Sequence, residues 1–213
     1  MSQSIKQIEA KIGTLSNPDK MPAYSWGISA KRCITGTKLA NQDGTVCSKC
    51  YANKGCYVFQ VVQDAQEFRY HAIEKIEWVD YMTELLTRKY KNLDKSRLFH
   101  RWFDSGDLQS LSHLMKIIEV CEHTPHIKHW LATREASIVS QIKESDVPKN
   151  LIIRVSATKV DGKPPKFWKW TSSVHKDKKA IGHACPSQYQ DNKCGSCRKC
   201  WDRRTKNVSY EEH

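Results

Sequence analysis

Apolar residues recur along the chain with two different periods. Between residues 58 and 91 they return every three or four positions, which predicts one long helix or two consecutive helices. Further along, compact apolar runs typical of buried strands alternate with segments of helical spacing. The expected strands are 98–103, 127–133 and 151–157, and the expected helices between them are 111–123 and 137–145. Strands and helices that alternate with short connections predict a parallel sheet with crossover helices.

This order predicts an α/β fold of βα repeats, TIM-barrel-like or a partial barrel, followed by a C-terminal Cys-rich metal-binding segment. The expected parts are an N-terminal helix or arm (1–22), a βα-repeat catalytic domain (23–184) with a Cys-bearing insertion (31–57), and the metal-binding segment (185–213). The catalytic domain should begin with a strand at 23–29. Its last part, 158–184, is polar and basic and is expected to be loop.

The charge balance points to a polyanionic partner. The chain has 35 Lys and Arg against 23 Asp and Glu, a net charge of +12. Such an excess is most common in proteins that bind DNA or another nucleic acid. The basic and aromatic residues Lys166, Trp168 and Lys169 could contact phosphates and stack on unpaired bases, although the same segment could be an edge strand that packs its tryptophans.

The sequence does not predict contact with a membrane. No stretch approaches the ~18 apolar residues of a membrane span. The N-terminal residues also lack the apolar block of a signal peptide. We therefore expect a cytoplasmic protein, and the sequence leaves its oligomeric state open.

Polar side chains follow each of the three central strands. Asp104, Ser105 and Asp107 follow the first, Arg134 and Glu135 the second, and the stretch from Ser156 to Lys159 the third. In parallel α/β folds the carboxyl ends of the strands form the floor of the site. We interpret Asp104, Asp107 and Glu135 as candidate catalytic carboxylates, with Arg134, Ser156 and Lys159 as substrate contacts. The alternative is that Asp104 or Ser105 only caps the next helix.

Eight of the nine cysteines fall into two groups, which in a chain without secretion signals favours metal binding over disulfides. The ninth, Cys121, lies in an apolar helical run and is expected in the core. Near the C-terminus, Cys194, Cys197 and Cys200 follow one another at x2 spacing, so that their thiolates can converge on one metal. Cys185 or His213 could be the fourth ligand, and the metal could be zinc or an iron–sulfur cluster.

The front group is less regular. Cys47-x2-Cys50 is compact, whereas Cys33 lies fourteen residues before Cys47. These three thiolates could hold a catalytic iron–sulfur cluster, a second zinc or no metal. Cys56 could be a fourth ligand or a buried thiol.

Several motifs together resemble a family of short phage proteins that are catalogued by gene-product number. They are Cys-x2-Cys-Tyr-Ala, the strand end Trp-Phe-Asp-Ser-Gly-Asp, Cys-x2-Cys-x2-Cys-Trp and the terminal Val-Ser-Tyr-x2-His. The resemblance covers most of the chain from about Tyr24. It implies a phage origin and, for such a protein, the cytoplasm of the host cell.

A shorter stretch, Asp104-Ser105-Gly106-Asp107-Leu108-Gln109, is similar to the Asp-Ser-Gly-Gly-Phe-Gln motif of tRNA-guanine transglycosylases. Their phage relatives exchange guanine in DNA for a 7-deazaguanine base. The resemblance implies that Asp104 acts on the base, that Ser105 and Gln109 contact it, and that Cys194, Cys197, Cys200 and His213 bind zinc. This chain departs from the pattern at Asp107, in its first zinc-ligand spacing, in its short length and in lacking a match for the separate nucleophilic aspartate.

The hypothesis that follows is a DNA-guanine transglycosylase. It would flip a nucleotide out of the stack and use two carboxylates, Asp104 and Asp107, with Glu135 or Asp161 in reserve. A second hypothesis is an iron–sulfur enzyme that resembles the radical S-adenosylmethionine class, with Cys33, Cys47 and Cys50 as ligands, although the usual Cys-x3-Cys-x2-Cys triplet is absent. A third is a non-catalytic, zinc-stabilised DNA-binding protein of a phage.

Overall fold

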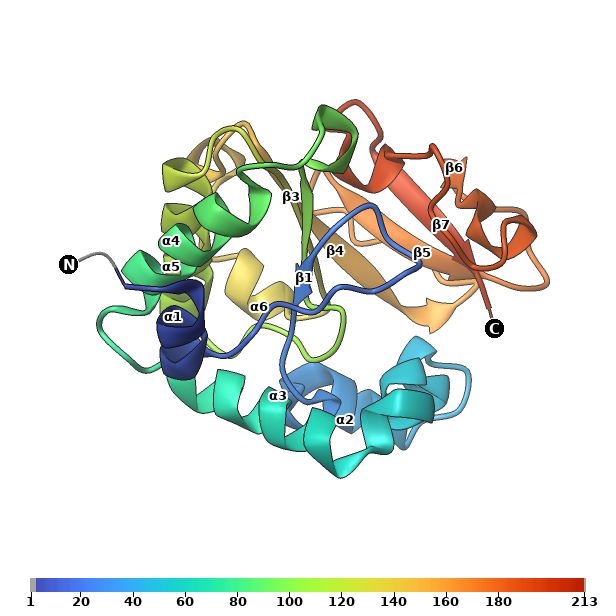
Figure 1. Cartoon of the computed structure of the whole chain (residues 1–213). Helices are drawn as coiled ribbons and strands as arrows, with labels where there is room; N and C mark the ends of the chain where they lie inside the picture. Colours follow the sequence, from blue (N-terminus) through green and yellow to red (C-terminus); the bar gives the residue numbers. More distant parts are fainter. Residues whose placement is uncertain (1–2, 213) are drawn as a thin grey trace.

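The structure is a computed structural model that describes residues 3–212 of the 213-residue chain. At its centre lies a seven-stranded sheet in the order β1-β2-β3-β4-β5-β7-β6, in which every neighbouring pair is parallel (Figure 1). The strands are β1 (Ser25–Trp26), β2 (Phe99–Trp102), β3 (Lys128–Thr133), β4 (Leu151–Val160), β5 (Thr171–His175), β6 (His183–Ala184) and β7 (Asn207–Glu211). The predicted βα-repeat class is confirmed. Within residues 3–212, no pairing of β1 with β6 closes the sheet into a barrel.

The helices gather on one side of the sheet and beneath it (Figure 1). They are α1 (Ile5–Ile12), α2 (Ile34–Ala40), α3 (Gln60–Ala72), α4 (Trp78–Tyr90), α5 (Leu111–His123) and α6 (Ala136–Val139). The 3-10 turns are η1 (Ala30–Arg32), η2 (Val46–Lys49), η3 (Tyr51–Asn53), η4 (Gly55–Val58), η5 (Lys95–Arg97), η6 (Glu144–Asp146), η7 (Pro186–Tyr189) and η8 (Lys199–Trp201). Helix α1 packs on α4, and α4 packs on α5.

Local sequence explains where several helices begin and end. Ser4 and Gln7 form a capping box that starts α1, and Ser110 caps α5. The periodic stretch 58–91 forms two helices, α3 and α4. The expected helix 137–145 is only the single turn α6, because the Ser140 and Gln141 side chains bond to the carbonyl of Ser137 and compete with helical backbone bonds.

Strands β5, β6 and β7 were not expected, because their residues are not apolar. Ser172 and Ser173 of β5 are nevertheless buried. Their hydroxyls pair across the sheet, Ser172 with Ser156 of β4 at 2.8 Å and Ser173 with Ser209 of β7 at 3.1 Å. Hydroxyls that satisfy one another can be buried at little cost. The segment 158–184 therefore adds strands to the sheet instead of forming loop throughout.

A cluster of aromatic rings fills the core between the sheet and the helices. Trp26 packs edge-on against Trp78 and Trp102, with ring centroids 5.6 and 5.9 Å apart. Buried imidazoles, including His113, complete this cluster. Cys121 is fully buried beside them, as expected. No helix within residues 3–212 has the length and apolar character needed to span a membrane.

Candidate functional site at the carboxyl edge of the sheet

Two glycines bring the ends of β1 and β2 into direct contact. A Cβ on Gly27 would lie 2.4 Å from Asp104 Oδ1, and a Cβ on Gly106 would lie 2.4 Å from Ile28 Cγ1. Gly106 also has φ 76°, a conformation that side chains disfavour. The loop after β2 can therefore lie against the chain that leaves β1 only with glycine at both positions.

Ser105 is buried in this contact, and its hydroxyl is used within the protein. It donates to the carbonyl of Ile28 at 2.7 Å and accepts from Gln66 Nε2 at 2.7 Å. The hydroxyl joins the loop after β1 to α3. Ser105 would have to give up these bonds to contact a substrate base, as the sequence hypothesis requires.

Asp107 joins the ends of β2 and β3. Its carboxylate accepts from the Leu108 amide at 2.8 Å, from Thr133 Oγ1 at 2.5 Å and from the Arg134 amide at 2.8 Å. Burial raises the pKa of Asp107 to about 6 against the opposing effect of these bonds. Glu135 is buried as well and accepts from the amide and hydroxyl of Thr35 at the start of α2. Both carboxylates thus hold the loops at this edge together.

Asp104 differs from these two carboxylates. Its Oδ1 atom is buried and has no hydrogen-bond partner, although the Arg101 and Arg69 guanidinium groups interact with its charge. The Nε atoms of Arg101 and Arg134 are also buried without partners. An unpaired acceptor and unpaired donors at one sheet edge are the groups that a bound ligand would satisfy.

The front cysteines lie at the same edge. Cys33 precedes α2, Cys47 lies in η2 and Cys50 directly precedes η3. The sulfurs of Cys33 and Cys47 are 3.5 and 3.6 Å from the point that a Cβ on Gly36 would occupy.

The charged side chains at this edge change the pKa of the front thiols. Burial raises the pKa of Cys33, and the charges of Asp107, Cys50, Cys47 and Glu135 raise it further. Burial also raises the pKa of Cys47, whereas Arg134 lowers it. Sulfur, carboxylate and guanidinium groups therefore meet in one place, while Cys56 is exposed.

The C-terminal cysteines form a second group around β6, η8 and β7. Cys200 is buried, and its sulfur is 3.2 Å from Tyr210 Oη. Burial raises the pKa of Cys200 to about 12, and the neighbouring Cys185 and Cys194 add to the rise. The Cys194 amide donates to the carbonyl of Lys20 at 2.9 Å, which ties this segment to the N-terminal part of the chain.

A histidine that the sequence interpretation missed belongs to this group. His183 Nε2 is 3.5 Å from the sulfur of Cys197. His183 precedes Cys185 by two residues, and this short spacing was the only signal. His213, the other candidate ligand, lies outside the described residues.

The remaining predicted contacts are spread over the sheet. Gln109 donates to the carbonyls of Arg32 and Asp107, and Lys159 is exposed near the end of β4. The Asp161 carboxylate accepts from three backbone amides of residues 176–178, which lowers its pKa. Asp161 therefore shapes a turn.

The basic aromatic segment is a correction to the expectation for Trp168. Trp168 is buried, and its indole donates to the carbonyl of Ile153, so it is a core residue and offers no face for base stacking. Lys166 and Lys169 are exposed. Lys169 lies over the Trp170 ring and is 4.0 Å from Glu144.

Metal ligation remains a prediction for both cysteine groups. Within residues 3–212, no group of three or more His, Cys, Asp and Glu side chains stands ready to hold a metal ion. All nine cysteines are free thiols. Their sulfurs would have to adjust around a metal that binds.

The fold and this edge define a parallel α/β protein with a cysteine-bearing insertion after its first strand. The model of the family described as Gene product 88 matches residues 3–203, and the chain therefore belongs to that family. This confirms the expected phage gene-product family, whereas nothing supports the resemblance to guanine transglycosylases. No curated protein and no solved structure matches the chain.

Proposed function

We propose that this protein is an iron–sulfur enzyme whose cluster is held by Cys33, Cys47 and Cys50. The observation that carries the proposal is the convergence of the Cys33 and Cys47 sulfurs on Gly36 at the carboxyl edge of a parallel sheet, where Asp107 and Cys50 are near enough to raise the pKa of Cys33. Chemistry in parallel α/β folds takes place at this edge.

The donor set fits an iron–sulfur cluster. A Cβ on Gly36 would lie only 2.9 Å from Cys33 Cβ, so glycine lets helix α2 approach the two thiols this closely. Arg134, which favours the thiolate form of Cys47, would offset part of the negative charge of the ligands. Cysteine thiolates are the usual ligands of such clusters. Helix α2 separates Cys33 from Cys47 and accounts for the long spacing between them.

Three protein ligands would leave one iron of a four-iron cluster free for a small molecule, and the cluster would supply electrons for radical chemistry. In the radical S-adenosylmethionine class, that molecule carries an amino group and a carboxylate. Asp104 Oδ1 has the chemistry to accept from an amino group, and Arg134 Nε has the chemistry to donate to a carboxylate. We therefore assign ligand binding to Asp104 and Arg134, and positioning of their loops to Asp107 and Glu135.

The C-terminal cysteines would bind a second metal, either zinc or a further cluster, with a structural role. Cys185 and Cys194 lie near enough to Cys200 to raise its pKa, and Cys197 contacts His183. Four thiolates form a closed ligand set, which is typical of structural sites.

The test is anaerobic reconstitution with iron and sulfide, followed by measurement of iron, acid-labile sulfide and visible absorption. The Cys33→Ser, Cys47→Ser and Cys50→Ser variants should each lose most of the iron of the front site. Cys56→Ser, which changes an exposed thiol of the same insertion, should keep it. Equal iron content in all four variants would overturn the proposal.

A second candidate function is exchange of guanine in DNA for a 7-deazaguanine base. The observation that favours it is the free, buried Oδ1 atom of Asp104 at a strand end, which could act on a base. Incorporation of labelled guanine into DNA by protein without iron would support this candidate. Incorporation that depends on the cluster, or none at all, would exclude it.

A further inference from the structure

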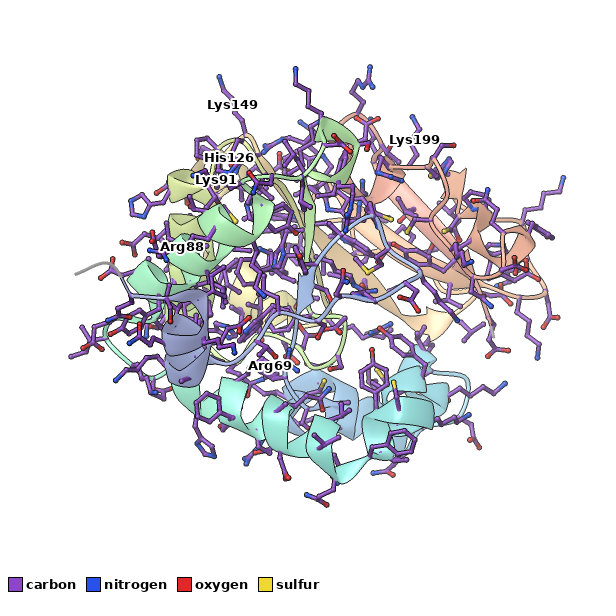
Figure 2. All side chains as sticks on the ribbon, viewed as in Figure 1. Arg69, Arg88, Lys91, His126, Lys149 and Lys199 are labelled. Carbon is purple, nitrogen blue, oxygen red and sulfur yellow. The ribbon has the colours of Figure 1, made fainter. Side chains whose placement is uncertain are left out.

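A basic hollow lies at the opposite, amino edge of the sheet, where β2, β3 and β4 begin. It has a volume of about 680 Å³ and is bordered by the segments 125–128, 149–151 and 198–204. In Figure 2 the labelled His126, Lys149 and Lys199 lie at the top of the molecule, and Arg69, which interacts with Asp104, lies on the lower side. The hollow is thus separate from the site of the front cysteines, whereas its Arg198 and Lys199 lie between Cys197 and Cys200 of the C-terminal group.

The charged side chains that line the hollow are almost all cationic. The lining contains one carboxylate, Asp202, and six Lys and Arg side chains, namely Lys128, Lys149, Arg198, Lys199, Arg203 and Arg204. Asp202 is itself paired with Lys199 and Arg204. Neighbouring cations repel one another, and a polyanion in the hollow would remove this repulsion.

Three of these cations are held in place by the protein. Lys128 and Arg198 lie over the Phe99 ring, at 5.5 and 5.2 Å from its centroid. Arg198 also donates to the carbonyls of Gly195, Cys197 and Ser96. Arg203 donates to the carbonyls of Pro148 and Leu151 and lies 4.2 Å from the centroid of the Trp170 ring. Cations that are already ordered lose less entropy when they bind a ligand.

We infer that this hollow is a binding site for the sugar–phosphate backbone of a nucleic acid. Phosphate contacts from Lys and Arg supply most of the affinity of such sites, and the guanidinium of Arg203, which bonds to the protein through one nitrogen, can hold a phosphate through the other two. The concave form favours a strand over a flat anionic membrane. The inference goes beyond the proposed function and does not depend on it, since the two sites share no residue.

The site was not visible in the sequence, because its cations come from three segments that are far apart along the chain. It also differs from the expected contacts Lys166 and Lys169, which are not among its lining residues. The two edges lie on opposite ends of the strands. A nucleic acid in the hollow would therefore be held away from the front cysteines.

The test measures binding of fluorescein-labelled oligonucleotides of about 20 nucleotides by anisotropy, between about 50 and 200 mM salt. Duplex DNA, single-stranded DNA and RNA are compared with vesicles that contain anionic lipid. The test variant is Lys128→Glu with Lys149→Glu, because both side chains are exposed in the hollow. The matched control is Lys54→Glu with Lys163→Glu, which makes the same change in charge at exposed positions elsewhere.

The test variant should bind a nucleic acid at least about tenfold more weakly than the wild type, with a log–log salt slope smaller by about two. The control should change little, and thermal melting should show that both variants fold. Substitution of the same two lysines by Gln should give an intermediate loss. Equal affinity of the test and control variants, or binding to vesicles without binding to any nucleic acid, would overturn the inference.

Discussion

The guanidinium of Arg154 donates through Nε to the carbonyl oxygen of Cys200 at 3.0 Å. Arg154 is fully buried in β4, and its other nitrogens donate to five further carbonyls, those of Thr171, Lys199, Asp202, Thr205 and Lys206. A buried cation is therefore satisfied by carbonyl dipoles instead of a carboxylate. These bonds fasten the segment 199–206 to the sheet.

Replacement of Arg154 should strongly destabilise the protein. Arg154→Leu leaves several carbonyls without donors, and we expect a loss of about 3–5 kcal/mol in the free energy of unfolding. Arg154→Lys keeps the charge but lacks the planar fork and should recover only part of the loss. Urea unfolding of the two variants measures both effects. A Lys variant as stable as the wild type would show that charge alone is sufficient.

Removal of a C-terminal thiol should release metal and lower stability together. If the C-terminal cysteines bind the proposed second metal, Cys197→Ser removes a ligand, so metal content and thermal midpoint should fall in parallel. Cys121→Ser changes a buried thiol outside both cysteine groups. It should lower stability without changing metal content and is therefore the control. His183→Gln shows whether the imidazole beside Cys197 is also needed. Unchanged metal content in Cys197→Ser would contradict the C-terminal metal site.

Asp104 and Asp107 should respond differently to the same substitution. Asp104→Asn alters a carboxylate oxygen without a partner, so stability should change by less than ~1 kcal/mol while turnover falls by orders of magnitude. Asp107→Asn loses an acceptor for Thr133 or Arg134, which should cost about 1–3 kcal/mol. Reductive cleavage of S-adenosylmethionine, base exchange into DNA and thermal melting are the readouts. Wild-type turnover in a folded Asp104→Asn protein in both assays would remove Asp104 from the site.

Stability should fall in acid because of the buried imidazoles. Burial lowers the pKa of His113 and of His129 to about 3, and it lowers that of His100 as well. Below about pH 6.5 these histidines bind protons in the unfolded chain but stay neutral in the fold. Each of them can therefore lower the free energy of unfolding by up to about 1.4 kcal/mol for each pH unit.

Asp107 acts in the opposite direction over part of this range. Its pKa is raised to about 6, so between about pH 6 and 4 the fold takes up a proton that the unfolded chain does not, and the gain in stability offsets the effect of about one histidine. Urea unfolding from about pH 7.5 to 5 gives the net slope. His113→Leu removes one of the three histidines and should reduce the slope of unfolding free energy against pH by the contribution of one histidine. A flat profile over this interval would contradict the burial of neutral histidines.

Apolar periodicity was sufficient to predict strands β2, β3 and β4, which are compact apolar runs, and helices α3, α4 and α5, whereas the expected helix 137–145 is only the single turn α6. It failed for β5 because Ser172 and Ser173 are buried through hydroxyl pairs, which hydropathy cannot register. At the site, sequence position singled out Asp107 and Glu135. Sequence position could not show that the carboxylate of Asp107 accepts from Thr133 and that of Glu135 from Thr35. Such contacts depend on distant segments that meet only after folding.

The placement of β7 imposes an order on the formation of the sheet. Residues 207–211 lie between β5 and β6, so the ribosome releases both neighbours before the strand that joins them. Until then β6 has no place in the sheet, and Arg154 lacks the carbonyls of residues 199–206. During synthesis, strands β1 to β5 can therefore assemble while the buried guanidinium of Arg154 in β4 still lacks most of its hydrogen-bond acceptors. In that interval β5 has an unpaired edge, and unpaired strand edges make a partly folded chain prone to aggregation.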